Sequence, residues 1–124
     1  MRKLLVLLTF SALPLAAQDA APTGARLWKA SLVSLATANA LDVHSSWGKR
    51  ELNSTLANRS GRFGAQGALI KLGLQGGLFG AEYLITRGHP SRRVYRALSV
   101  INFGAAATFS ATAIRNYGIP APPR

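Results

Sequence analysis

The sequence predicts an all-α protein, a small bundle of about three transmembrane helices that follows an N-terminal signal peptide. Nearly half of the 124 residues are apolar (48%), and 15% are charged, compared with about 25% in ordinary soluble domains. Three long, largely apolar segments each reach the roughly 20 residues that a helix needs to cross a bilayer. The length allows one small domain.

The first 17 residues are typical of a signal peptide. Arg2 and Lys3 form a positive start, residues 4–15 are apolar, and small residues follow, so we expect cleavage after Ala17. An uncleaved anchor stays open as the alternative, but the stretch is short for a span and is interrupted by Pro14. Removing the two basic residues with the peptide lowers the net charge from +11 to +9.

The remaining chain divides into three parts. We expect a linker at 18–26, a helical membrane domain at 27–117 and a Pro-rich tail at 118–124. Within the domain, the expected helices cover about 27–47, 64–86 and 94–115. The third segment has the strongest pattern, because 97–114 contains no charged residue and is apolar all round the helix, unlike the surface helix of a soluble protein.

The second segment is the least apolar of the three, because it contains Lys71, Gln75 and Glu82. Two charges at the centre of a span cost roughly 5 to 7 kcal/mol on an insertion scale, so this helix depends on its neighbours. At about 100° per residue, the three polar residues share one face. We therefore expect them to be covered by the other helices.

The opposite face of the second segment is lined by glycine. The residues are Gly73, Gly76, Gly77 and Gly80. They form two overlapping GxxxG pairs, which allow close approach of another helix. Since both faces need cover, we expect this helix in the middle of the bundle.

The other two segments offer polar partners. The expected intramembrane polar network comprises Asn39, Asp42, Lys71, Gln75, Glu82 and Asn102. Antiparallel helices place Asp42 level with Lys71, and Glu82 level with Lys29 or Arg96. We expect ion pairs at both levels, because an unpaired charge in hydrocarbon is costly.

The sequence contains no convincing catalytic, cofactor-binding or metal-binding pattern, and we expect no enzyme activity. Asp42, His44 and Ser45 are the residue types of a hydrolase triad, but Asp42 and His44 lie about 200° apart on a helix. His44 and His89 have no second ligand at helical spacing. The chain has no cysteine, which excludes disulfides and thiol chemistry.

The chain carries 15 Lys and Arg residues against 4 Asp and Glu. In a soluble protein this excess would indicate nucleic acid, but the basic residues lie between the apolar segments, as in membrane proteins. We therefore expect anionic lipid headgroups and no nucleic acid as partners. The positive charges are balanced between the two sides, so the signal peptide alone favours an N-terminus outside the bacterial inner membrane.

The string from Asp42 to Asn53 carries a resemblance. Asp42, Ser45 and Ser46, followed by Glu51 and Asn53, resemble an Asp-x-x-Ser/Thr-Ser/Thr … Glu-x-Asn-Pro pattern in small bacterial membrane proteins of uncharacterised function. Ser54 replaces the usual proline after Asn53. The rigid turn that a proline would impose is therefore not expected at this point. The resemblance implies a membrane helix bundle, in which these five residues would form any shared site.

Three functions agree with these observations. The first is a structural or accessory membrane subunit that receives a partner helix or forms a homo-oligomer. The second is a small transporter or ion-conducting oligomer that uses Asp42, Lys71 and Glu82. The third is a soluble, basic periplasmic protein that binds anionic lipid or polymer; a membrane enzyme has the least support.

Overall fold

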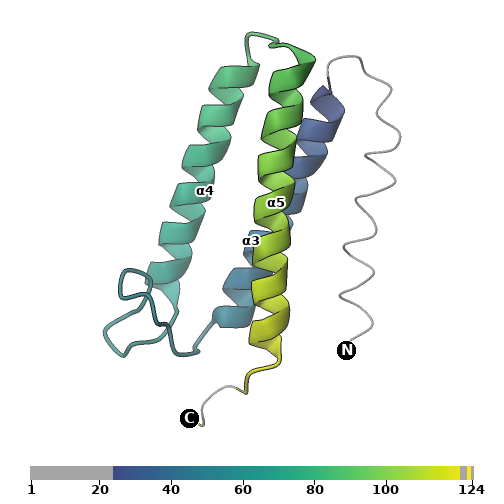
Figure 1. The fold of residues 1–124 in the computed structure, drawn as a ribbon. Coiled ribbons are helices and arrows are strands. Elements are labelled where there is room, and N and C mark those ends of the chain that lie inside the picture. The colour runs from purple at the N-terminus through teal and green to yellow at the C-terminus, as the bar shows by residue number, and fades with distance from the viewer. Residues whose placement is uncertain (1–23, 121–122, 124) are drawn as a thin grey trace.

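A computed structural model describes residues 24–120 and 123, and this part of the chain folds into three helices without a strand (Figure 1). The helices are α3 (Ala25–Ser46), α4 (Ala65–Thr86) and α5 (Arg92–Tyr117). The predicted all-helical fold is confirmed, and the helix ends differ from the predicted ones by at most two residues. The expected signal peptide and most of the expected linker lie outside the described residues.

The helix ends follow local backbone chemistry. Gly24 precedes α3 with φ of 73°, a left-handed conformation that glycine adopts without steric cost. Ser91 is the N-cap of α5 in an extended conformation, directly after Pro90, which cannot donate a backbone hydrogen bond. Only residues 87–91 separate α4 from α5. This short connection holds the two helices antiparallel.

Consecutive helices run in opposite directions, so α3 and α5 are parallel to each other (Figure 1). These two helices pack closely along their length, around a core of Leu35, Ala38 and Ala106. Ser31 and Ser99 are also fully buried. Small side chains at this contact allow the two backbones to approach each other.

Helix α4 is not in the middle of the bundle, and that expectation was wrong. It approaches α3 closely at few points, and its buried residues are limited to Gly67, Ala68, Glu82 and Thr86. A Cβ atom added at Gly73, Gly76, Gly77 or Gly80 would meet nothing within 4 Å in the described chain. The small-residue faces of α3 and α5 match each other directly, whereas α4 reaches them through longer polar side chains.

The connection from α3 to α4 is a compact loop that folds back on the start of α4. Two isolated antiparallel bridges, Arg50 with Arg62 and Ala57 with Phe63, hold it together. The amide of Gly48 donates to the carbonyl of Phe63 over 2.8 Å. Phe63 is 1% exposed, and its ring packs against the start of α4 at Gly67. This contact holds the loop in place.

Helix α5 is long and apolar enough to cross a membrane, and it alone meets this test among the described residues. Only 22% of the apolar stretch of α5 is buried inside the bundle. The core helix of a soluble protein would be mostly buried. Helices α3 and α4 do not meet the test. Each contains charged and amide side chains: Lys29, Asn39 and Asp42 in α3, and Lys71, Gln75 and Glu82 in α4.

The loop packing predicts that Gly67→Ala destabilises the fold. A Cβ at this position would lie 2.6 Å from the carbonyl oxygen of Leu56 and 2.6 Å from the Phe63 ring, and overpacking of this kind costs about 1 to 3 kcal/mol. The free energy of unfolding, measured in mixed micelles by circular dichroism during titration with a denaturing detergent, should fall by this amount.

The matched control is Gly73→Ala on the same helix. Open space surrounds this position, and alanine is a better helix former than glycine by about 1 kcal/mol. This variant should be as stable as the parent chain or more stable. Equal effects of the two substitutions would contradict the packing of the loop on Gly67.

Candidate functional site

Polar side chains gather where α4 faces the α3–α5 pair, and we call this cluster the polar seam. Its members are Trp28, Ser31, Asn39, Asp42, Lys71, Gln75, Glu82 and Asn102. Three side chains of α4 form hydrogen bonds with residues of α3: Lys71, Gln75 and Glu82. These three residues therefore share one face, as the helical spacing predicts.

The end of the seam nearest the loop is an ion pair between Lys71 and Asp42. The ammonium group of Lys71 donates to Oδ2 of Asp42, and their side chains are 17% and 2% exposed. The same ammonium lies 5.1 Å from the ring centroid of Phe63 and 5.9 Å from that of Phe109. One carboxylate and two aromatic faces thus stabilise the charge of Lys71, and the expected pair is present.

The middle of the seam is an amide pair. Nδ2 of Asn39 donates to Oε1 of Gln75 over 2.6 Å. Asn39 is 2% exposed, so this hydrogen bond is shielded from water on the α3 side. It lies one helical turn from the ion pair on both helices, which fixes the antiparallel register of α3 and α4.

The other end of the seam is built around Glu82, which is 2% exposed. Its Oε2 atom accepts hydrogen bonds from Nε1 of Trp28 over 2.6 Å and from Nδ2 of Asn102 over 3.0 Å. The same Asn102 nitrogen lies 3.1 Å from Oγ of Ser31. Glu82 therefore connects all three helices.

The expected ion pair of Glu82 with Lys29 or Arg96 was wrong. Within the described residues, Lys71 with Asp42 is the one ion pair, and Lys29 and Arg96 are both exposed. Both cations lie in the first two turns of their helices, on the surface of the bundle. Neutral donors, an indole and an amide, take their place.

Four buried oxygen atoms of the seam accept no hydrogen bond within the described chain. They are Oδ1 of Asn39, Oδ1 of Asp42, Oε1 of Glu82 and Oδ1 of Asn102. Buried polar atoms in folded proteins are almost always paired. These four oxygens are acceptor sites that the described side chains leave unused.

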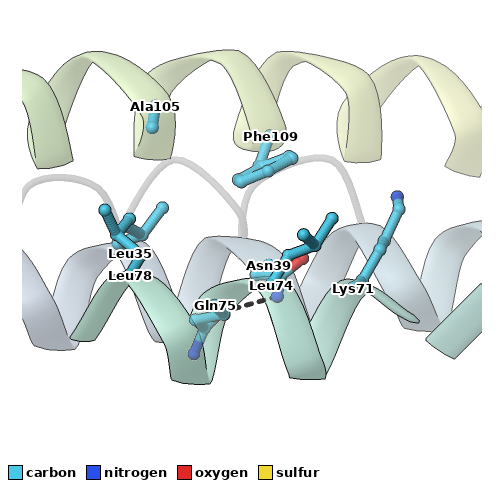
Figure 2. Close-up of a pocket in the computed structure, with 8 residues that line it drawn as sticks. All are labelled: Leu35, Asn39, Lys71, Leu74, Gln75, Leu78, Ala105 and Phe109. Atoms are coloured by element: carbon cyan, nitrogen blue, oxygen red, sulfur yellow. Dashed lines mark hydrogen bonds between the residues drawn. The ribbon is translucent and has the colours of Figure 1, made fainter. Parts of the chain in front are cut away.

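A pocket of about 210 Å³ opens beside the middle of the seam. Ala105 and Phe109 of α5 lie on one side of it, opposite the side chains of α3 and α4 (Figure 2). The full lining is Leu35, Asn39, Lys71, Leu74, Gln75, Leu78, Ala105 and Phe109. The pocket exists because α4 stands away from the closely packed α3–α5 pair.

Three residues near the end of α3 are of the types found in a hydrolase triad, but they do not form one: Asp42, His44 and Ser45. Oγ of Ser45 donates to the backbone carbonyl of Asp42 over 3.0 Å. His44 is exposed, and its Nδ1 lies 2.7 Å from the hydroxyl of Tyr117. His44 therefore joins the ends of α3 and α5, whereas Ser45 bonds within α3.

The residues of the Asp-x-x-Ser-Ser … Glu-x-Asn string do not meet at one site. Oε1 of Glu51 accepts from the amide of Asn53 over 2.9 Å, and Oδ1 of Asn53 accepts from the amide of Thr55 over 3.0 Å. Oγ of Ser46 accepts from Nδ2 of Asn116 on α5. Glu51 and Asn53 therefore shape the loop, while Asp42 belongs to the seam.

No protein-family model matches this chain. No curated protein and no solved structure matches it either. In the part of the chain that the structure describes, no three His, Cys, Asp or Glu side chains come close enough together to hold a metal ion.

Sequence reasoning missed the contributions of Trp28 and Phe63. A tryptophan near a helix end is typical of the membrane interface, whereas Trp28 is 8% exposed and donates to Glu82. One signal was available, because Trp28 and Ser31 are three residues apart and so lie on one helical face. The ring of Phe63 comes from a loop, where periodicity gives no information.

The buried ion pair predicts strong coupling between Asp42 and Lys71. Asp42→Asn or Lys71→Gln alone leaves one uncompensated buried charge, which costs about 3 to 5 kcal/mol. Both changes together should restore part of this loss. The measurement is a double-mutant cycle on the free energy of unfolding in micelles, with Lys29→Gln as an exposed control; purely additive losses would contradict the pairing.

Proposed function

We propose that this protein is an integral protein of the bacterial inner membrane and serves as a structural or accessory subunit. In this proposal a signal peptide exports the chain, and all three helices lie in the bilayer with the N-terminus outside. One observation carries the proposal: the described chain buries polar side chains and exposes large apolar ones. The resemblance to small bacterial membrane proteins agrees with it.

The interior of the bundle is rich in polar groups. Ser31, Asn39, Asp42, Glu82 and Asn102 are each 2% exposed or less. In water, such groups gain nothing from leaving the solvent unless they are paired. In a bilayer they must turn inward, because hydrocarbon offers no hydrogen bonds.

The outer surface is apolar where it would meet lipid. On α4, Leu69, Leu74 and Leu84 are 60 to 71% exposed, and on α5, Val100 and Ile101 are 72% and 57% exposed. A soluble monomer rarely exposes a contiguous apolar surface of this kind. Lipid contact would cover it.

Charged side chains occur at the two ends of the bundle and inside the seam. One end carries Arg26, Lys29, Arg87, Arg92, Arg93 and Arg96, and the other carries Lys49, Arg50, Arg59, Arg62 and Arg115. These positions suit anionic headgroups at both membrane surfaces. The charges of α4 that would oppose its insertion are covered by α3 and α5.

The accessory role is supported by the glycine surface of α4. Gly73, Gly76, Gly77 and Gly80 leave its backbone open to another helix, a surface that membrane helices use for association. The pairing of Lys71 with Asp42 supports a structural role for these charges over ion conduction. No catalytic constellation accompanies them in the described residues.

Membrane integration predicts that the tagged chain stays in the membrane fraction during a carbonate wash. Ile101→Arg places a charge on the exposed surface near the centre of α5 and costs about 2.5 to 3.5 kcal/mol of insertion free energy, so less protein should be integrated. The matched control is Leu52→Arg, in the loop, where the side chain is 88% exposed. This control should be integrated normally.

Native mass analysis of the washed, solubilised protein tests the subunit role. A second polypeptide in fixed ratio would support an accessory subunit. A homo-oligomer that conducts ions in vesicles would instead favour the transporter. Release of the chain into the wash would contradict membrane integration and favour a soluble basic periplasmic protein.

A further inference from the structure

The loop between α3 and α4 places two arginine side chains next to each other. Arg50 and Arg62 form an antiparallel bridge. The residues that flank them exchange backbone hydrogen bonds of 3.0 and 2.9 Å across the bridge, so the two arginines form a pair without a hydrogen bond of its own. The side chains of such a pair lie on the same face, with Cβ atoms about 4.5 to 5.5 Å apart.

Both arginine side chains lie on the side of the loop that faces away from the bundle. Successive side chains of an extended segment alternate between its two faces. The neighbouring Phe63 is 1% exposed and packs against Gly67, so Arg62 faces the opposite way. Arg50 shares the face of Arg62, and both residues are exposed.

The two positive charges have no acidic partner in the described chain. Within these residues the one ion pair joins Lys71 to Asp42. Glu51 follows Arg50 and lies on the opposite face by the same alternation, and its Oε1 atom accepts from the amide of Asn53. Like charges directly opposite each other on paired strands are destabilising. A bound anion would relieve this repulsion.

Backbone hydrogen bonds hold the loop in this shape before any ligand binds. Oδ1 of Asn58 accepts from the amides of Ser60 and Arg62 over 2.9 and 3.0 Å. The amide of Asn58 donates to the carbonyl of Arg62 over 2.8 Å. Both backbone groups of Arg62 are therefore fixed, so binding orders little more than two side chains, which lowers the cost of association.

Two adjacent guanidinium groups match the chemistry of a phosphate group. Each presents a planar fork of N–H donors that engages carboxylate or phosphate oxygens in pairs. A carboxylate has two oxygens, which one fork occupies. A terminal phosphate has three free oxygens and a charge of about −1.5 to −2 at pH 7, so it can engage both forks and balance both charges. A phosphodiester has two free oxygens and a single charge.

We propose that Arg50 and Arg62 form a binding site for a terminal phosphate group, one with at least three free oxygens. The two guanidinium groups donate to its oxygens from the outer face of the loop. Two sources share this chemistry, namely a lipid whose headgroup is a phosphate monoester and a phosphate in solution. The lipid source rests on the membrane location proposed above, whereas binding of a dissolved phosphate does not.

The test uses the full chain in maltoside micelles, which contain no phosphate, and follows the arginine Nε–H resonances by NMR. The probes are inorganic phosphate, dihexanoyl phosphatidic acid and dihexanoyl phosphatidylglycerol. Saturable shifts at Arg50 and Arg62 with phosphatidic acid alone would assign a lipid headgroup, and saturable shifts with inorganic phosphate would assign a dissolved source as well. Phosphatidylglycerol is a diester with the same chains, and it should bind roughly 10-fold more weakly than phosphatidic acid.

Four variants locate the site. Arg50→Gln and Arg62→Gln should each weaken saturable binding by roughly 10-fold or more, the effect of losing a charged donor. Arg50→Lys keeps the charge but loses the planar fork, so it should also weaken binding. Arg59→Gln removes the same charge from an exposed position of the same loop, outside the bridge, and should change the affinity by less than about 2-fold because solvent screens this charge.

Shifts that grow linearly with all three probes would overturn the proposal. Equal saturable binding of phosphatidic acid and phosphatidylglycerol would overturn it as well. So would equal losses in Arg59→Gln and Arg62→Gln, because these results indicate a general attraction of the basic loop for anions. None of these results bears on membrane integration, which the carbonate wash tests separately.

Discussion

The attachment of α4 depends on hydrogen bonds and one ion pair across the polar seam. This helix buries few residues of its own, and its contacts with the rest of the bundle run from Lys71 and Asp42 to Glu82 and Trp28. In water, each such contact would add only about 1 kcal/mol, because the separated groups would be hydrated. In hydrocarbon the separated groups have no solvent partner, so the same contacts oppose detachment more strongly.

The rest of the architecture follows from this constraint. Helices α3 and α5 pack backbone to backbone through alanine and serine, and they leave their polar residues turned toward α4. Because long side chains such as Lys71 and Gln75 span the remaining distance, α4 stands away from the pair. This separation opens the pocket near Phe109. The glycine surface lies on the opposite side of α4, where nothing in the described chain packs against it. The seam and the pocket are thus consequences of one arrangement.

The sequence predicts the three helices well, because their apolar length and the Gly and Pro residues between them are local signals. It also predicts the shared face of Lys71, Gln75 and Glu82, and the pair with Asp42, because helical periodicity and depth are sufficient for both. It fails where the answer depends on which helices pack together. The order of the bundle was wrong, since a small-residue face does not identify its partner, and Glu82 is bonded by Trp28 and Asn102, whose tertiary positions no local pattern specifies.

The proposed membrane location places the exposed apolar surface against lipid and the polar seam inside the bundle. The chain has no cysteine, so single cysteines at Leu84, Ile101 and Leu52 can carry nitroxide spin labels in vesicles, where collisions with oxygen report lipid and collisions with a water-soluble nickel chelate report solvent. Lipid contact predicts high oxygen and low nickel accessibility at Leu84 and Ile101, and the reverse at Leu52. High nickel accessibility at all three positions would contradict it.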